Sequence, residues 1–410
     1  MVKKLHTLFQ ISIVVLLCRP LLAQPGCQDP AATNYNPNAT STNASCTYTT
    51  TQAPLANKIA SFPDTCKEAS SLLYTDGRMF TNNDSGNKPI LFQLDTLTGA
   101  VLKYTTISNY NNEDWEDLAA DSLHVYIGEF GNNSGDRTNL KVLKVKKSAL
   151  YNPDSTSIKA VAIKFNYPDQ TSFVSSSTHN FDCEAFFYHK GLLHLFSKNR
   201  GNLKTKHYTL NPNLATQTAV LKDSLNTNGL ITSATIRSDG KVVTLLGYNS
   251  SNGTVFSWLL FGFDSTNYFG GNRRRLELPN ALFTGQAEGI GFRDEYRLWV
   301  SNEKLVSPLG TVIAKMKQLN VKPYLQSFFT DVQSIVVENQ MLAWPNPTRN
   351  LLEIGDGITK LTFWDATGKE MKYEIIANAK SASTANWPSG LYLMKGVKNG
   401  KAISTKILKE

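Results

Sequence analysis

The sequence predicts an all-β protein, built as a five- or six-bladed β-propeller followed by a small C-terminal β-sandwich. A sixteen-residue phrase returns along the chain. Short strands with alternating apolar and polar residues, separated by Gly-, Asn- and Pro-rich turns, fill the interval from about residue 51 to residue 335. In that interval nothing longer than a turn has the period of an amphipathic helix, so the class is all-β.

The repeated phrase opens on a glutamate, passes through a polar turn and ends fifteen residues later in Asn or Glu. Three copies match in length, a fourth is shorter and a fifth begins with Ser233; the copies are Glu68–Asn83, Glu184–Asn199, Glu288–Glu303, Glu116–Glu129 and Ser233–Asn249. In chain order their starts lie 48, 68, 49 and 55 residues apart, which suits one four-stranded propeller blade each. The longest interval leaves room for a sixth blade at 157–168. A pair of β-sandwiches or a solenoid is the competing architecture.

The N-terminal end predicts export. Residues 1–23 carry Lys3 and Lys4, an apolar run and a terminal Ala23, as in a cleaved signal peptide, and the run is too short to remain as a membrane span. After removal, no transmembrane segment is expected. Residues 24–50 are rich in Asn and Thr, and a disulfide between Cys27 and Cys46 would stabilise this stretch by about 3 kcal/mol. The stretch resembles Cys-bounded modules of Bacteroidota surface proteins; a disordered linker is the alternative.

The C-terminal segment holds three landmarks in order, Trp344-Pro-Asn-Pro347, the strand and turn 361–369, and Trp387-Pro-Ser-Gly390 with the strand that follows. Their order and spacing, from 341 to 410 after a linker at 336–340, resemble the type A C-terminal sorting domain of the type IX secretion system. That resemblance implies recognition by the secretion machinery, transit through the periplasm, and a final location that is secreted or on the outer cell surface. An ordinary adhesive immunoglobulin-like domain is the alternative.

The net charge of +9 invites a nucleic-acid interpretation, but its distribution argues against one. The signal contributes +3 and residues 341–410 contribute +4, which leaves +2 for residues 24–340. The only dense basic run, Arg273-Arg-Arg275, is expected at a solvated hairpin tip, and no base-stacking motif accompanies it. We therefore expect no nucleic-acid partner.

The glutamates that open the repeats are the predicted metal ligands. Equivalent positions on successive blades form rings around a central channel, so one mouth of the channel should gather Glu68, Glu116, Glu184 and Glu288. Four carboxylates at close quarters cannot all stay ionised unless cations balance them, and Ca²⁺ takes several oxygen ligands. The alternative is that these acids accept backbone hydrogen bonds from neighbouring blades and serve only as structural glue.

The ends of the second strands supply further polar groups near the same mouth. The predicted ligand-binding residues are Asn83, Asp84, Glu129, Asn132, Arg137, Asn199, Asn302 and Glu303. Arg137 offers a counter-charge in place of a metal. Because the copies differ most around 83–84, 116 and 129–137, activity is expected there.

The remaining reactive residues suggest structural roles. Cys66 and Cys183 lie near the starts of two repeats, and in an exported protein a disulfide between them is favoured over a nucleophilic thiol, with a stabilisation near 4.7 kcal/mol in the chain-entropy model. His124 and His194 alternate with apolar residues inside strands and are expected to be packing or surface residues rather than catalytic bases. No sequence motif of a hydrolase triad, zinc protease or phosphate-binding loop occurs in the chain.

The central repeats resemble, more loosely than the tail resembles its family, the SdiA-regulated, esterase-like phytase and gluconolactonase propellers. Glu288-Gly-Ile-Gly-Phe292 is the best local match to the metal-binding Glu-Gly phrase of the last group, whose full ligand set is not matched here. The resemblance implies a propeller with a Ca²⁺ site. The expected function is binding of an extracellular ligand or partner at the channel mouth; the alternative is a Ca²⁺-dependent hydrolase of phosphate esters or lactones.

Overall fold

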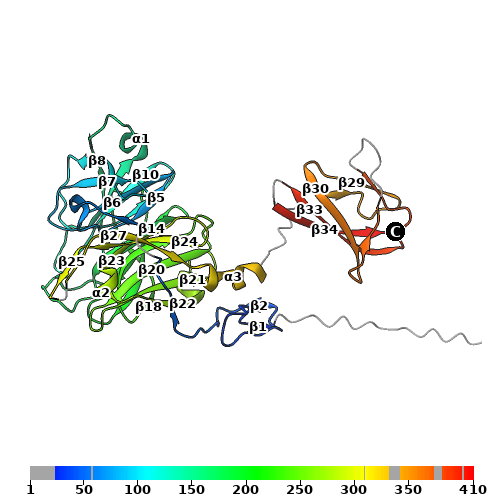
Figure 1. Ribbon diagram of the computed structural model, residues 1–410, viewed down its shortest axis with the longest axis horizontal. Coiled ribbons are helices and arrows are strands. Elements are labelled where there is room, and N and C mark those ends of the chain that lie inside the picture. Colours follow the sequence, from blue (N-terminus) through cyan, green and yellow to red (C-terminus); the bar gives the residue numbers. More distant parts are fainter. Residues whose placement is uncertain (1–23, 57–58, 309, 332–341, 374–380, 399–400) are drawn as a thin grey trace, which may run out of the picture. The chain divides into compact units, whose positions relative to one another are not determined.

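The computed structural model describes residues 24–56, 59–308, 310–331, 342–373, 381–398 and 401–410 (Figure 1). The predicted signal peptide and the predicted linker at 336–340 lie outside these residues. The chain divides into two compact units, 1–328 and 329–410. Strands dominate both units, and the described helices are short: α1 (Lys147–Leu150), α2 (Ala281–Thr284), α3 (Lys322–Asp331), η1 (Asp64–Cys66) and η2 (Tyr268–Gly270). The all-β prediction is confirmed.

The first unit begins with a small disulfide-closed loop. Strands β1 (Pro25–Gly26) and β2 (Ser41–Thr42) pair in parallel, and Cys27 and Cys46 are joined. Asp29 takes the place of a core, since its carboxylate accepts hydrogen bonds from the Ala31 amide, the Tyr48 hydroxyl and Ser327 Oγ. The predicted disulfide is confirmed, and the segment is an ordered loop rather than a linker.

Five antiparallel sheets follow, each built from consecutive strands. In chain order, the sheets are β5 (Leu73–Thr75), β6 (Arg78–Asn82), β7 (Ile90–Leu94) and β8 (Val101–Ile107); β9 (Trp115–Ala120), β10 (His124–Glu129), β11 (Lys141–Lys146) and β13 (Val161–Asn166); β14 (Asp182–His189), β15 (Leu192–Lys198), β16 (Lys204–Leu210) and β18 (Val220–Asn226); β19 (Leu230–Ile236), β20 (Val242–Asn249), β21 (Thr254–Phe261) and β22 (Asn272–Leu278); and β23 (Gln286–Phe292), β24 (Arg297–Glu303) and β27 (Lys315–Asn320). We call them the first to the fifth sheet.

Short strands from elsewhere in the chain complete the sheet edges. The fifth sheet takes its fourth strand from the N-terminal side, where β4 (Ala60–Ser61) pairs antiparallel with β27. Parallel additions are β3 (Thr51–Gln52) on β22, β12 (Ser157–Ile158) on β8 and β17 (Thr216–Thr218) on β13. The segment 157–168, expected to hide a sixth unit, instead supplies β12 to the edge of the first sheet and β13 to the second sheet. A small hairpin of β25 (Leu305–Ser307) and β26 (Gly310–Val312) extends the fifth sheet's connection.

The opening strands of the sheets are neighbours in a cyclic order. β9 contacts β14, β14 contacts β19, β19 contacts β23, β23 contacts β5, and β5 contacts β9. Aromatic and aliphatic side chains fill the space between consecutive sheets; Phe130 and Phe186, from the second and third sheets, meet edge to face at 5.1 Å between ring centroids. Each such fully buried ring contributes about 1.5 to 3 kcal/mol through removal from water.

The expectations for the two remaining cysteines and for the arginine run of the first unit are wrong. Cys66 and Cys183 are buried free thiols, because they pack into different hydrophobic clusters. Burial raises the pKa of Cys66 to about 11, which keeps that thiol protonated. Arg273-Arg-Arg275 lies within β22 rather than at a hairpin tip, so its side chains alternate in direction, and the guanidinium of Arg274 lies 4.9 Å from the ring centroid of Tyr48.

The second unit contains two sheets that share one hydrophobic cluster, as expected for a small β-sandwich. One sheet is β28 (Ala343–Trp344), β29 (Leu351–Ile354) and β32 (Ser381–Ser383), and the other is β30 (Ile358–Asp365), β31 (Glu370–Met371), β33 (Gly390–Lys398) and β34 (Lys401–Lys409). Leu352, Phe363 and Met394 are fully buried in the shared cluster.

Candidate functional site

A β-bulge in the opening strand of the third, fourth and fifth sheets defines the site. In the third sheet Cys183 pairs with Ser197 and Ala185 with Phe196, which leaves Glu184 as the extra residue. The same pattern leaves Glu288 in the fifth sheet and Thr232 in the fourth. A bulge turns its extra residue away from the regular ladder, and bulges are common beside functional sites.

The same register identifies the counterparts in the first two sheets. Ala69 bridges Asn83 and the following Ser70 is the extra residue, while Trp115 pairs with Glu129 and is followed by Glu116. The equivalent residues are therefore Ser70, Glu116, Glu184, Thr232 and Glu288, all at most 5% exposed. We call them the bulge set. The sequence alignment of the repeats places Glu68 and Ser233 at these positions, which is wrong by two residues and by one residue. Alignment by residue type cannot detect the extra residue that a bulge adds to a strand.

Glu68 differs from the three other predicted metal ligands, which are buried, although its charge helps to raise the pKa values of Asp84 and Glu303. Its side chain is 41% exposed and accepts a hydrogen bond of 2.5 Å from Asn87 Nδ2. Ser233, which lacks the repeat's carboxylate, donates instead to Asp117 Oδ2 at 3.0 Å and accepts from the Ile290 amide. Because Asp117 also accepts from the Ala234 amide, these groups tie the second, fourth and fifth sheets together.

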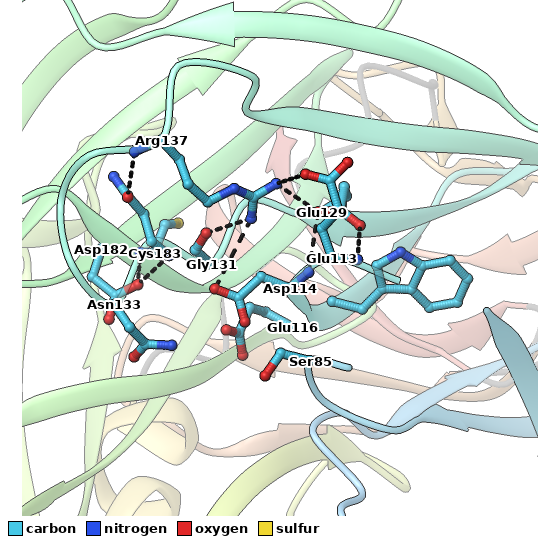
Figure 2. A network of polar contacts seen from close by, with 12 residues as sticks. Ser85, Glu113, Asp114, Glu116, Glu129, Gly131, Asn133, Arg137, Asp182 and Cys183 are labelled. Atoms are coloured by element: carbon cyan, nitrogen blue, oxygen red, sulfur yellow. Dashed lines mark hydrogen bonds and ion pairs between the residues drawn. The ribbon is translucent and has the colours of Figure 1, made fainter. Parts of the chain in front are cut away.

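Glu116 lies in a cluster of three carboxylates. Asp84, Asp114 and Glu116 each present one oxygen within 4.8 Å of the others. Asp84 follows β6 and Asp114 precedes β9; Asn112 holds the two loops together by donating to the carbonyls of Asn83 and Asp84 at 3.0 and 2.8 Å. Ser70 Oγ donates to Glu116 Oε2 at 3.2 Å. Figure 2 shows Asp114 and Glu116 next to one another. We call Asp84, Asp114 and Glu116 the carboxylate cluster.

The electrostatics of the carboxylate cluster are unfavourable without an added cation. Burial, followed by repulsion from Asp84 and Asp182, raises the pKa of Asp114 to about 7. Burial and the charges of Glu184 and Asp84 raise the pKa of Glu116 well above its ordinary value. Asp114 is 7% exposed, and its Oδ1 has no hydrogen-bond partner. Buried Asn83 Oδ1 is also unpartnered. Oxygens that face no donor suit a hard cation.

Glu184 has counter-charges of its own. Lys198 Nζ pairs with Glu184 Oε2, and Arg200 Nη2 lies 3.7 Å from Glu184 Oε1. Burial alone would lower the pKa of Lys198, but the carboxylates of Glu184 and Glu288 raise it well above its ordinary value. Arg200 also pairs with Asp182 at 2.9 Å. Glu288 is less completely neutralised than Glu184, because its buried Oε1 has no hydrogen-bond partner.

Arg137 supports a loop next to the carboxylate cluster. Its guanidinium donates to Glu129 Oε1 at 2.7 Å, to the Gly131 carbonyl at 2.6 Å and to Glu113 Oε2 at 3.2 Å (Figure 2). Arg137 Nη1 lies 3.9 Å from Asp114 Oδ2, beyond hydrogen-bond reach. The Arg137 guanidinium thus neutralises Glu129 and Glu113 first and contributes only a distant charge to the carboxylate cluster.

Gly131 is packed directly on the carboxylate cluster. A Cβ at this position would lie 2.3 Å from Glu116 Oε1 and 2.4 Å from the Asp114 carboxyl carbon. The requirement for glycine therefore comes from the close approach of the loop backbone to the carboxylates.

The other predicted ligand-binding residues mostly hold loops. Asn132 accepts from the Arg137 amide and donates to the Phe181 carbonyl, Asn199 accepts from Ser197 Oγ, and Asn302 donates to the Ile313 carbonyl. Asn83 Nδ2 donates to the Thr65 carbonyl. Glu303 does face the acidic region: burial, then Glu288 and Asp84, raise its pKa well above the ordinary value.

Several residues at the site could not be predicted from the repeat, namely Ser70, Asp114, Gly131, Asp182, Lys198, Thr232 and Arg200. The acidic phrase Glu113-Asp114 shortly before Glu116 was the one available signal for Asp114. The role of Lys198 depends on the register of β14 and β15, which places it opposite Asp182.

Comparison with known proteins identifies the tail. Residues 342–410 match the family described as secretion system C-terminal sorting domain. The chain therefore carries a type IX sorting tail and is exported across the outer membrane to a secreted or surface location. Among the described residues no helix is long and apolar enough to cross a membrane. No curated protein sequence matches the chain.

Solved structures offer only distant likenesses. Hydrazine synthase of Kuenenia stuttgartiensis is 11% identical over 67% of this chain and 66% of its own, with a TM-score of 0.31. A proposed 6-phosphogluconolactonase from Bacteroides uniformis is 12% identical, with 83% and 86% covered and a TM-score of 0.32. The extracellular domain of a proposed one-component system from B. thetaiotaomicron is 10% identical, with 84% and 57% covered and a TM-score of 0.31. The chain spans just under two thirds of the hydrazine synthase chain, and such scores carry no argument about activity.

Proposed function

We propose that the first unit is a five-bladed β-propeller that binds a divalent cation, Ca²⁺ above all, at the carboxylate cluster and uses that mouth to bind an extracellular ligand or partner. The cyclic contacts of the opening strands support the propeller. So does the pairing of β4 with β27, by which an early strand completes the last sheet.

The cation site is carried by one observation: three carboxylates meet within 4.8 Å while Asp114 Oδ1 stays buried without a partner. A cation would supply the missing counter-charge and coordinate that oxygen. Carboxylate and amide oxygens are hard donors, which favour Ca²⁺ over softer metals. Asn83 directly precedes Asp84 in the chain, and its buried, unpartnered Oδ1 is our candidate for a further ligand.

Calorimetric titration of the full mature chain with Ca²⁺ after EDTA treatment tests the cation site. Native protein should bind, and Ca²⁺ at a hundredfold excess over its Kd should stabilise the fold by about 2.7 kcal/mol. Gly131→Ala, which pushes a methyl group at Glu116 and Asp114, and Asp114→Asn should each weaken binding at least tenfold.

Glu113→Gln is the matched control, because Glu113 neighbours Asp114 but faces Arg137. It should bind as native protein does. Native protein that gives neither heat nor a rise in Tm would refute the cation site. EDTA-sensitive turnover of phosphate esters or lactones by native protein would replace the binding role with the hydrolase.

The sorting tail has a separate test. Deletion of residues 341–410 should leave the protein in the periplasm, whereas the full chain reaches the outer surface or the medium. Normal surface delivery of the truncated chain would refute the role of the tail.

A further inference from the structure

A chain of polar side chains runs through the interior of the third sheet, away from the carboxylate cluster. Asp223 on β18 lies next to His207 on β16, with 3.2 Å between Asp223 Oδ1 and His207 Nδ1. His207 Nε2 lies 2.9 Å from Nδ1 of His194 on β15. His194 Nε2 lies 3.2 Å from the carbonyl oxygen of His189, at the end of β14.

This chain is enclosed between the third and fourth sheets. His194 and His207 are fully buried, and the rings of Phe187, Phe196 and Phe269 pack around them. Tyr268 of η2 packs against both imidazoles, and its hydroxyl lies 2.8 Å from His189 Nδ1. The charged groups that face the chain are Asp223, whose side chain is 28% exposed, and, at longer range, Lys222 and Lys190.

The three contacts need three hydrogens. The Asp223 carboxylate and the His189 carbonyl are acceptors only, so His207 Nδ1 and His194 Nε2 must both carry a hydrogen. The contact between the two imidazoles needs one hydrogen more. Two neutral imidazoles carry only two hydrogens in total, so one contact is left with two acceptors facing each other unless the chain holds one additional proton.

We infer that Asp223, His207 and His194 together hold one proton in the folded protein, and that this proton makes the junction between the third and fourth sheets sensitive to pH. Asp223 is the carboxylate that contacts this pair of imidazoles, so the geometry places the additional proton in the contact between Asp223 and His207, which spans 3.2 Å. Burial and the neighbouring His207 lower the pKa of His194 to about 3, so His194 is the neutral member.

The expected dependence on pH has a definite sign. An unfolded histidine releases its proton near pH 6.5. The folded chain retains a proton there, so unfolding above that pH releases it and stability falls as pH rises. An exported protein meets variable external pH, and this junction would tighten on acidification.

The Asp223→Asn substitution should remove the need for the additional proton while it keeps the three contacts. An amide N–H at position 223 can donate to His207 Nδ1, which then donates through Nε2 to His194, so all three contacts are made without an added proton. Asp264→Asn is the control, since Asp264 is an exposed carboxylate close in sequence to η2.

Thermal unfolding of the full chain from pH 6 to pH 9, in EDTA throughout, gives the test. The Tm of native protein and of Asp264→Asn should fall as pH rises, and it should fall more steeply than the Tm of Asp223→Asn. The difference in slope should correspond to about one more proton released on unfolding. Equal slopes in native protein and Asp223→Asn would overturn the inference.

Imidazole nitrogen chemical shifts provide a second readout that does not depend on stability. At pH 7.5 native protein should show one imidazole with both nitrogens protonated, and Asp223→Asn should show none in this pair. Two neutral imidazoles in native protein at that pH would also overturn the inference.

Discussion

Glu116 and Glu184 occupy the same position in the second and third sheets, yet their surroundings are opposite. Both are the extra residue of a bulge and both are buried. Glu184 is paired with Lys198 and lies close to Arg200, whereas Glu116 is surrounded by Asp84 and Asp114 and receives one hydrogen bond from Ser70. We call the surroundings of these two residues the Glu184 corner and the Glu116 corner. The protein neutralises the Glu184 corner with its own cations and leaves the Glu116 corner with excess negative charge.

One register position accounts for the difference. Lys198 lies opposite Asp182 in the third sheet, where the fourth sheet has Tyr248 opposite Leu230 and the fifth has Glu303 opposite Gln286. In the first sheet the Asp84 amide bonds to the carbonyl of Glu68 in the same way. A repeated backbone thus places a base in one sheet and acids in two others. The functional asymmetry comes from these substitutions rather than from the glutamates that recur.

Removing Lys198 should leave the Glu184 corner without its main counter-charge. Lys198→Met leaves Glu184 and Glu288 buried without their shared cation, which should cost about 3 to 5 kcal/mol of unfolding free energy. Denaturant unfolding of the full chain measures it. The double variant Lys198→Met/Glu184→Gln should recover part of the loss. A cost below about 1 kcal/mol would mean that Arg200 or water already neutralises this corner.

Matched Glu→Gln changes at the two corners should have opposite signs in EDTA at pH 8. Glu184→Gln removes an ion-pair partner and should destabilise the fold. Glu116→Gln removes a repelling charge and should stabilise the metal-free fold by about 1 to 4 kcal/mol, the Coulomb range for charges near 4 Å. With Ca²⁺ present, Glu116→Gln should lose this advantage. Parallel melting curves with and without Ca²⁺ measure both effects, and equal signs would remove the distinction between the corners.

The sequence predicted the repeat architecture better than the site. Alternating short strands and the returning phrase predicted the all-β class, and the landmarks between Trp344 and Lys409 predicted the sorting tail that the comparison confirms. The bulge could not be predicted, because an extra residue in one strand leaves no compositional signature. Glu68 therefore took the place that belongs to Ser70, and Thr232 was passed over for Ser233.

The predicted disulfide between Cys66 and Cys183 failed for a similar reason. Cys66 and Cys183 both lie near strand starts, but disulfide formation depends on the distance between Cα atoms, which sequence spacing does not give. Lys198 was missed because it faces Asp182, sixteen residues away, and approaches Glu184 only through the register of β14 and β15.

Acidification should distinguish the metal-free and the metal-bound states of the Glu116 corner. The pKa of Asp114 is about 7 in the folded protein, mainly through burial, and about 3.9 when unfolded. The folded state therefore binds this proton more tightly, so metal-free stability should rise as pH falls from about 7 towards 4, by up to about 1.4 kcal/mol for each pH unit. Ca²⁺ affinity should fall over the same range, since the cation competes with the proton. Asp114→Asn should show smaller changes of both kinds, by about the share of one proton, since Glu116 keeps its raised pKa.

The two hydroxyl members of the bulge set should give the smallest effects, and they should differ from each other. Ser70→Ala removes the donor to Glu116 Oε2, and Thr232→Val removes the donor to the Ala287 carbonyl at 2.8 Å. Each loss should cost about 0.5 to 1.5 kcal/mol in the metal-free protein. Only Ser70 touches the carboxylate cluster, so only Ser70→Ala should also change Ca²⁺ affinity, by a few fold. Calcium titration of both variants decides it: an equal change in the two would mean that the bulge set acts as one ring, and that the contrast between the Glu116 and Glu184 corners is weaker than their contacts indicate.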